Sequence, residues 1–382
     1  MKTVLRNGLV VSEDFSSFLP LDIVISDGVI ESLVERGAEI ADADEVIDAA
    51  GSYVLPGLID IHVHGGMGVH YATDSDFTPA LRFSAREGVT TVLPTLATRP
   101  MDDMRSSIAT VLSQAKRECG ARIGGIHLEG PFISAKKKGA MMTPKDVCSV
   151  ENFHMLYEWA GDALRVMTIA PEREGALAVI ERGAALGVRM SIGHTEASVE
   201  EALAAIRCGA RGATHTFNAM GGFSHRAPGA VGAVLTSPEV SCEVISDMVH
   251  LAPEAVKLVL LAKGVDGFIL VSDSGKIAGL GDGDYLVDGQ IRYVRGGVSR
   301  HENGTIAGSS YTMADGARRL LGIGCSLLDV AKMGARNPAR AVGLSDRGVI
   351  GVGKLADLLI TDEKLNIREV ILRGKIYRED IG

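Results

Sequence analysis

The fold and the chemistry of this chain are indicated by one stretch, Val54-Leu55-Pro56-Gly57-Leu58-Ile59-Asp60-Ile61-His62-Val63-His64. Its apolar, β-branched run is typical of a buried strand. Because successive side chains of a strand point to opposite faces, His62 and His64 share one face. A rise of about 3.3 Å per residue puts them roughly 6–7 Å apart, so both imidazoles can reach one metal ion. The alternative is two ordinary histidines on a half-buried strand.

The composition is that of a globular protein with one large domain and a small appendage. The chain has 382 residues, of which 46% are hydrophobic and 23% charged. Its net charge of −9 argues against a nucleic-acid partner, and an anionic substrate would need a locally positive pocket. The five cysteines are scattered without a CxxC motif, which favours reduced thiols in a cytoplasmic protein. No apolar run is long enough to predict a membrane span.

Strand-like and helix-like segments alternate through the middle of the chain. Eight β-then-α units predict an α/β fold of the TIM-like (β/α)8 barrel type over residues 53–345. The alternative is an open doubly wound sheet, but no Gly-x-Gly-x-x-Gly follows the first strand. The eight strand-like runs are residues 53–64, 89–95, 123–130, 164–172, 188–195, 212–220, 240–250 and 267–274.

Both ends of the chain have a different pattern, with short β segments and no helical periodicity. Asp27-Gly28 lies between two apolar runs, which is a strong hairpin signal. Residues 356–360 and 369–375 are strand-like in the same way. We therefore expect residues 1–52 and 346–382 to join into one small β-sandwich domain.

Polar side chains gather where the predicted barrel strands end. Catalytic groups of a (β/α)8 barrel lie at the C-terminal ends of its strands. Histidines and carboxylates without cysteine suit zinc or another divalent first-row metal in a partly open catalytic site. Such an ion acidifies water and polarises a carbonyl, and an aspartate at the last strand end can carry the proton. This chemistry is hydrolysis of an amide-like bond, and the residues are His62, His64, His127, Glu129, His194, His215, Asp247, His250 and Asp273.

Over essentially its whole length, the chain resembles the amidohydrolase superfamily, and more closely the N-acetylglucosamine-6-phosphate deacetylase family. The resemblance implies removal of an acetyl group from an N-acetylhexosamine 6-phosphate, with N-acetylglucosamine 6-phosphate as the first choice. The motifs that carry it are Pro56 to Gly66, His127-Leu128-Glu129-Gly130-Pro131-Phe132, Gly193-His194-Thr195, Ala213 to Met220, His225-Arg226-x-Pro228-Gly229 and Asn303 to Ser310.

The resemblance also implies roles for individual residues. Glu129, His194 and His215 match the common metal ligands, while His62 and His64 match a pair that holds a second ion in some members. One or two divalent ions are thus implied, with zinc as the first choice and iron or manganese as alternatives. Asp273 matches the general base and acid. The positions that hold the sugar phosphate, with an arginine that crosses a homodimer interface, match Asn218, the backbone of Ala219, Arg226 and His250.

Three positions depart from the family pattern. Met141 stands where a histidine usually contacts the sugar, Ala227 replaces an acidic residue, and Lys276 comes near the expected mouth of the barrel. A thioether is a poor acceptor and no donor, so a polar sugar contact is lost at Met141. These changes leave open a different N-acyl amino sugar, another epimer, or a substrate whose added anion meets Lys276. Less favoured alternatives are a cyclic-amide hydrolase and a catalytically silent binding homologue.

The remaining histidines receive other assignments. His127 shares a strand face with Glu129, and we expect it beside the metal ligands rather than among them. His70, His154 and His301 are expected in surface positions or loops.

Overall fold

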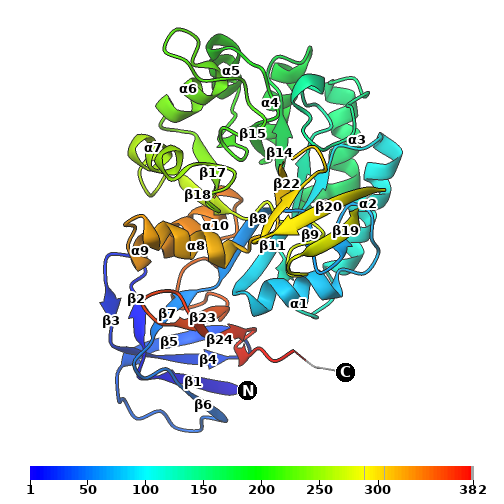
Figure 1. Cartoon of the computed structure of the whole chain (residues 1–382). Helices are drawn as coiled ribbons and strands as arrows, with labels where there is room; N and C mark the ends of the chain where they lie inside the picture. The colour runs from blue at the N-terminus through cyan, green and yellow to red at the C-terminus, as the bar shows by residue number, and fades with distance from the viewer. Residues whose placement is uncertain (288, 305, 380–382) are drawn as a thin grey trace.

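A computed structural model describes residues 1–287, 289–304 and 306–379. Figure 1 shows a barrel surrounded by helices, with a smaller β domain at one end. Both termini of the chain lie at the end that holds the small domain (Figure 1).

The barrel consists of parallel strands, one within each of the eight predicted runs. Hydrogen bonding follows chain order, and the Asp273 amide donates to the His62 carbonyl over 2.9 Å, which brings the last strand end to the first. The predicted (β/α)8 barrel is therefore confirmed as a nearly closed ring. Its strands are β8 (Leu58–Val63), β11 (Val89–Ala97), β13 (Ile126–Glu129), β14 (Leu164–Ile169), β15 (Arg189–Ile192), β16 (Gly212–Ala213), β17 (Ser241–Ile245) and β18 (Phe268–Val271). The short β12 (Arg122–Ile123) also pairs with β11.

Helices follow the strands and cover the outside of the barrel (Figure 1). Some of them begin at a capping side chain, as in α5, where Ser198 accepts from the amide of Glu201 and the Glu201 side chain accepts in return. The long helices are α1 (Thr78–Arg86), α2 (Met101–Gln114), α3 (Val150–Ala160), α4 (Ala176–Ala185), α5 (Val199–Arg207), α6 (Gly229–Thr236), α7 (Pro253–Lys263) and α8 (Met313–Gly322). The shorter segments are α9 (Leu327–Ala331), a π-helical turn at Lys332–Arg336 and α10 (Asn337–Ala341). None of the described helices has the length and apolar character that crossing a membrane requires.

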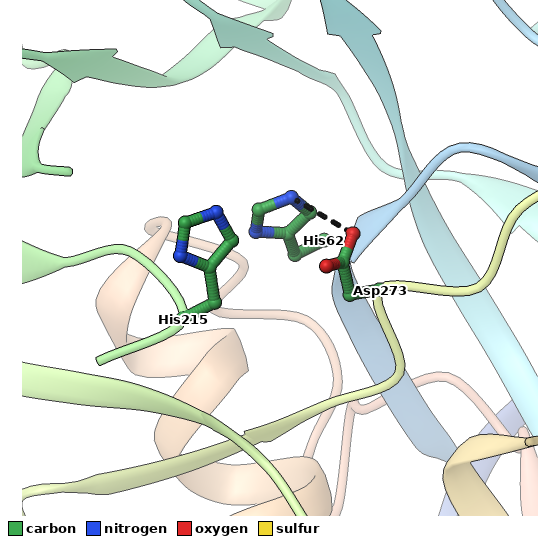
Figure 2. A group of neighbouring side chains, drawn as sticks. All are labelled: His62, His215 and Asp273. Carbon is green, nitrogen blue, oxygen red and sulfur yellow. Dashed lines mark ion pairs between the residues drawn. The ribbon is translucent and has the colours of Figure 1, made fainter. Parts of the chain in front are cut away.

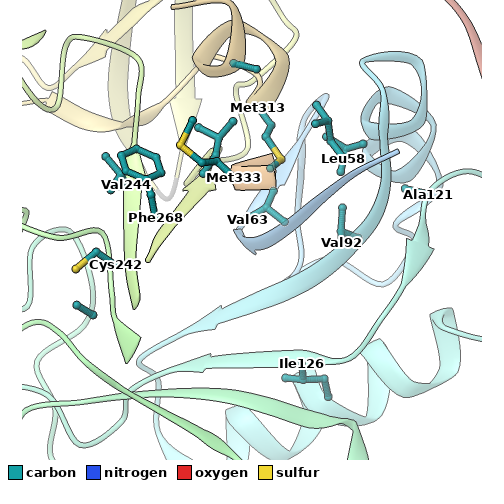
Figure 3. Packing of buried hydrophobic residues seen from close by; sticks show 14 of the residues in the cluster. Leu58, Val63, Val92, Ala121, Ile126, Cys242, Val244, Phe268, Met313 and Met333 are labelled. Carbon is teal, nitrogen blue, oxygen red and sulfur yellow. The ribbon is translucent and has the colours of Figure 1, made fainter. Parts of the chain in front are cut away.

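The hydrophobic core fixes β8, and with it the His-x-His pair. Leu58 and Val63 of β8 belong to one buried cluster with Phe268 of β18 and the helical residues Met313 and Met333 (Figure 3). A second buried cluster joins other residues of five barrel strands to the α10 region. Strand β8 is thus held on both sides by apolar packing, and only its polar end is free for chemistry.

The small domain contains two sheets, which confirms the β-sandwich expectation. One sheet has the order β5-β4-β1-β6 and the other β25-β24-β23-β7-β2-β3. Its strands are β1 (Lys2–Arg6), β2 (Leu9–Val11), β3 (Phe18–Leu19), β4 (Leu21–Ser26), β5 (Val29–Glu35), β6 (Glu45–Asp48), β7 (Tyr53–Pro56), β23 (Leu358–Thr361), β24 (Ile367–Leu372) and β25 (Lys375–Ile376). Strand β7 pairs with β2 and β23, so the first predicted run is divided at Gly57 between the two parts of the molecule. The domain bounds of 1–52 with 346–382 and 53–345 stay a prediction.

Two small sheets lie outside this plan. A two-stranded unit, β9 (Gly65–Gly66) with β10 (Val69–His70), follows the His-x-His strand directly. A four-stranded antiparallel sheet, coloured yellow in Figure 1, is inserted after β18, and the sequence analysis did not predict it. It comprises β19 (Gly283–Val287), β20 (Gln290–Arg295), β21 (Val298–Arg300) and β22 (Ile306–Ser309). A bridge between Ser274 and Ser309 ties this sheet to the segment that follows β18.

Candidate active site

A cavity of about 360 Å³ lies at the C-terminal ends of the barrel strands. It collects most of the residues that the sequence analysis assigned to the site. His62 lies beneath the lining and is completely buried, whereas Arg226 is exposed and does not line this cavity. The predicted residues that do line it are His64, Glu129, Met141, His194, His215, Asn218, Ala219, His250 and Asp273.

Glu129 is the centre of the polar cluster. Its Oε1 atom lies 2.9 Å from His194 Nε2, 3.1 Å from His215 Nε2 and 3.3 Å from His62 Nε2. Its Oε2 atom lies 3.3 Å from His64 Nε2. One carboxylate at the end of β13 therefore reaches all four of the predicted histidine ligands.

Asp273 completes the cluster from the end of β18. Its Oδ1 atom lies 3.2 Å from His64 Nε2 and 3.5 Å from His62 Nε2. Figure 2 shows the Asp273 carboxylate and the imidazoles of His62 and His215 turned toward one common space. The structure thus brings together all five predicted metal ligands and the predicted base.

The hydrogen-bond partners of Nδ1 in His62, His64 and His194 indicate the tautomer of each ring. Nδ1 lies 2.6 Å from the Lys137 carbonyl in His194, 3.2 Å from the Thr95 carbonyl in His64, and 2.9 Å from Glu243 Oε2 in His62. These oxygens only accept, so Nδ1 carries the hydrogen. A neutral ring then has its lone pair on Nε2.

These Nε2 lone pairs face the oxygens of Glu129 and Asp273, which also carry lone pairs. Electron-rich atoms that converge in a buried space need a positive charge between them. The Nε2 atom of His62 accordingly has no hydrogen-bond partner among the described residues. Histidine tautomers fixed by outer carbonyl and carboxylate groups are typical of metal ligands. The residues present therefore fit a divalent cation.

Four overlapping sets of ligand atoms among the described residues are close enough to hold an ion, and two of them consist entirely of predicted metal ligands. Within each set, the atoms lie within 4.8 Å of one another. The first set is Glu129, His194 and His215, and the second is His62, His64 and Glu129. Three protein ligands with an open position are the arrangement of catalytic zinc sites.

The electrostatics keep both carboxylates ionised. Burial opposes the charged form of Glu129, but the imidazoles of His62 and His194 hold its pKa well below the usual value. Burial likewise opposes ionisation of Asp273, and His62 and His64 hold its pKa well below the usual range. In the cation's absence, burial opposes protonation of His64, yet Asp273 and Glu129 raise its pKa to about 9. Asp273 is therefore ionised at neutral pH, which is the form that a general base needs.

The backbone turns sharply where three of these side chains attach. His194, His215 and Asp273 have φ angles of 48°, 28° and 49°, in the left-handed region that side chains rarely adopt. Non-glycine residues held there carry strain, which concentrates at functional sites. The strained turns end the strands abruptly and leave these side chains at the mouth of the barrel.

Two residues behind the ligands complete the site. His127 contacts the Ile61 carbonyl through Nδ1 over 2.9 Å and the Thr168 hydroxyl through Nε2 over 2.8 Å. Both ring nitrogens are engaged and burial lowers its pKa to about 4, so His127 is a neutral support for the cluster. Glu243 of β17 holds His62 and was missed by the sequence analysis. A glutamate within the apolar run Cys242-Glu243-Val244-Ile245 was the signal that could have revealed it.

The opposite wall of the cavity contains polar groups suited to an anion. His250 Nδ1 lies 2.7 Å from Asp247 Oδ2. Burial lowers the pKa of His250, but the hydrogen bond and charge of Asp247 outweigh that effect and raise it overall. The buried Nδ2 of Asn218 has no partner among the described residues. An imidazole whose pKa is raised and a free amide donor are both suited to a phosphate oxygen.

Two of the three departures from the family pattern also fall in the cavity, whereas Ala227 is exposed and does not line it. Met141 lines it, and the Met141 sulfur lies 3.4 Å from the amide of Thr98. Lys276 lines it as well, with Nζ 3.4 Å from Asp74 Oδ2. His70, expected at the surface, instead lines the cavity and stacks on His64 with ring centroids 5.9 Å apart.

Comparison with known proteins agrees with this geometry. The model of the amidohydrolase family matches residues 53–377. The chain belongs to this family. An N-acetylglucosamine-6-phosphate deacetylase from Bacillus subtilis (strain 168) is 35% identical, covering 92% of this chain and 91% of the relative. An N-acetylgalactosamine-6-phosphate deacetylase from Escherichia coli O157:H7 is 32% identical, covering 92% and 93%.

Solved structures extend the similarity to the whole fold. N-acetylglucosamine-6-phosphate deacetylase from Pasteurella multocida superposes with a TM-score of 0.90 at 27% identity, covering 99% of this chain and 100% of its own. The Mycobacterium smegmatis deacetylase, solved in complex with N-acetyl-D-glucosamine-6-phosphate, gives 0.88 at 31% identity, covering 98% of both chains. The resemblance to this deacetylase branch of the amidohydrolases is therefore confirmed.

Proposed function

We propose that this amidohydrolase removes the acetyl group from an N-acetylhexosamine 6-phosphate, with N-acetylglucosamine 6-phosphate as the first substrate. The observation that carries the proposal is the convergence of Glu129, His194 and His215 with Asp273 on one cavity. Relatives at 35% and 32% identity, which are named for the glucosamine and the galactosamine epimer respectively, support the substrate class and leave the epimer open.

The reaction is cleavage of the amide C–N bond by water. Glu129, His194 and His215 would hold a divalent ion, which would supply Lewis acidity toward the acetyl carbonyl and toward water. Asp273 accepts the proton that the attacking water loses and returns it to the nitrogen as the C–N bond breaks. The water oxygen leaves in acetate, and the amine remains on the sugar phosphate.

We place a second ion site at His62, His64 and Glu129. This site is supported by the tautomer of both histidines, which leaves a lone pair on each Nε2 atom, facing carboxylate oxygens. Histidine and carboxylate ligands suit zinc first, with iron and manganese as alternatives. Glu129 belongs to both sets, so it would contribute a ligand to each ion site.

The phosphate is assigned to His250, Asn218 and the backbone of Ala219, which line the cavity and follow the neighbouring strands β16 and β17. Arg226 is exposed and outside the cavity of its own chain, so we assign it to the cavity of a second subunit in a homodimer. A guanidinium fork from the partner would complete the phosphate site. The scattered cysteines and a sugar-phosphate substrate both suit a cytoplasmic enzyme.

Replacement of the base tests this assignment. Asp273→Asn keeps the shape of the side chain but removes the proton acceptor, so kcat should fall by about 10²–10⁴-fold. Metal content by mass spectrometry and binding of N-acetylglucosamine 6-phosphate by calorimetry should persist. Glu200→Gln, at an exposed position of α5, is a control for loss of a carboxylate outside the ion sites. Near-normal turnover by the Asp273 variant would refute the role of the residue.

A further inference from the structure

A second positively charged region lines the cavity. Four cationic side chains belong to the lining: Arg99, Lys138, Lys276 and Arg292. Among the described lining residues, the acids are Glu129 and Asp273, and both belong to the metal centre. The whole chain has a net charge of −9, so this concentration of positive charge is a local feature. Local positive charge in a cavity is how an acidic protein attracts an anionic ligand.

The order of the barrel strands separates these cations from the proposed phosphate site. Arg99 follows β11, Lys138 follows β13 and Lys276 follows β18, with β8 between β11 and β18 in the ring. The proposed phosphate contacts instead follow β16 and β17. The two groups therefore follow different strands, and β18, which precedes Lys276, is the neighbour of β17 in the ring.

Arg99 and Lys276 each form an ion pair with an acidic residue that does not line the cavity. Arg99 Nη2 lies 3.6 Å from Asp103, and its buried Nε has no hydrogen-bond partner among the described residues. Lys276 Nζ lies 3.4 Å from Asp74. The side chain of Asp103 is 51% exposed and that of Asp74 is 37% exposed. Water screens ion pairs at such positions strongly. Because these ion pairs are weak, both cations can still bind an anionic ligand inside the cavity.

The inserted sheet β19–β22 adds a guanidinium to the same cavity. Arg292 of β20 is only 9% exposed and lines the cavity together with Val287 and Ile306 of the same sheet. It donates to Gln290 Oε1 over 3.3 Å and contacts the ring of His301. The planar fork of an arginine matches a carboxylate, sulfate or phosphate with two hydrogen bonds.

We propose that the substrate carries a second anionic group, a carboxylate, sulfate or phosphate, in addition to the 6-phosphate, and that Arg99, Lys276 and Arg292 bind it. The proposal rests on the proposed deacetylase function and narrows its substrate class. Met141 fits it, because a thioether offers no hydrogen bond to a free sugar hydroxyl. A hydroxyl that carries an anionic substituent does not need that contact.

The test compares substrates with one and two anions on the zinc-loaded enzyme. The single-anion substrate is N-acetylglucosamine 6-phosphate. The double-anion compounds carry the added group at O3 (a lactyl ether), at C1 (a phosphate), or at the end of the acyl chain (a succinyl amide). We expect kcat/KM for at least one of the three to exceed that of the single-anion substrate about 10-fold, as one charge-assisted contact provides. The compound preferred then identifies where the second anion is attached.

Variants show whether the cations cause that preference. In Arg99→Gln/Lys276→Met, the ratio of the two kcat/KM values should fall about 10-fold or more. Lys136→Met, which removes a cation that is 81% exposed and outside the cavity, should leave the ratio unchanged. Thermal unfolding checks that each variant folds, and the two single variants replace the double variant if it does not.

The outcomes separate the two proposals. Turnover of N-acetylglucosamine 6-phosphate above all three double-anion compounds would overturn the second-anion proposal and leave the deacetylase function standing. A preference that persists in the double variant would overturn the assignment to these cations. If the zinc-loaded enzyme releases no acyl group from any of the four compounds, the deacetylase proposal itself fails.

Discussion

Replacing Glu243 tests whether the carboxylate behind His62 tunes the second ion site. Glu243 Oε2 lies 2.9 Å from His62 Nδ1, and both side chains are completely buried. Glu243→Gln keeps an oxygen acceptor of nearly the same shape but removes the negative charge. Because the carboxylate raises the basicity of the ring that it holds, we expect the variant to bind the second ion more weakly.

The expected loss of ion affinity follows from the energy of the hydrogen bond between Glu243 and His62. A hydrogen bond to a charged group contributes about 1.5–3 kcal/mol, compared with about 0.5–1.5 kcal/mol for a neutral one. The loss of roughly 1.4 kcal/mol corresponds to an approximately 10-fold higher dissociation constant for the ion. Glu243→Ala removes the acceptor as well, so its effect should approach the upper end of the range of about 10–100-fold for such outer partners.

The assay is equilibrium dialysis against a series of zinc buffers, followed by metal analysis of the protein. Wild-type protein should show two binding steps, and only the step assigned to His62 and His64 should weaken in Glu243→Gln. Glu239→Gln is the matched control, because it removes the same charge four residues away at an exposed position. Two unchanged binding steps in Glu243→Gln would refute the reasoning.

Three further changes test other parts of the account. Asp247→Asn should lower the pKa of His250, because Asp247 raises it; a histidine NMR titration reads this, and an unchanged pKa would contradict the pairing. Since the folded pKa exceeds the usual 6.5, the wild-type pair stabilises the fold below pH 6.5, and this contribution is lost as the pH rises through the folded pKa. Leu58→Ala should cost about 3–5 kcal/mol in urea unfolding, since Leu58 is buried in the barrel core (Figure 3), whereas a comparable loss in the exposed control Leu261→Ala would undermine the packing argument. Met141→His should raise kcat/KM for N-acetylglucosamine 6-phosphate about 10-fold by adding one polar contact, and a decrease would show that the wall requires the thioether.

Much of the barrel was predictable because each strand leaves a local signal. Buried parallel strands are continuous apolar runs, and the residues that end them stand out as polar. His62, Glu129, His194, His215 and Asp273 could therefore be found by position alone, since strand ends of a closed barrel meet at one mouth.

Other features depended on contacts that a local pattern does not contain. The run from Tyr53 to His64 looks continuous, yet its first four residues pair with strands from the two termini. Periodicity shows that a segment is a strand but does not name its partner. The sheet β19–β22 has mixed apolar and polar residues with exposed faces, so it leaves a weak signal. Glu243, Arg99 and Arg292 acquire their places in the site only through tertiary packing.

Acetate release by the zinc-loaded protein tests the central claim most directly. The substrates to compare are N-acetylglucosamine 6-phosphate, N-acetylgalactosamine 6-phosphate and unphosphorylated N-acetylglucosamine, with a metal-free sample as the control. The account predicts that a phosphorylated sugar releases one acetate per amine formed, that the unphosphorylated sugar reacts far more slowly, and that metal removal stops the reaction. Equal turnover with and without the phosphate, or none from either phosphorylated sugar at full metal content, would contradict it.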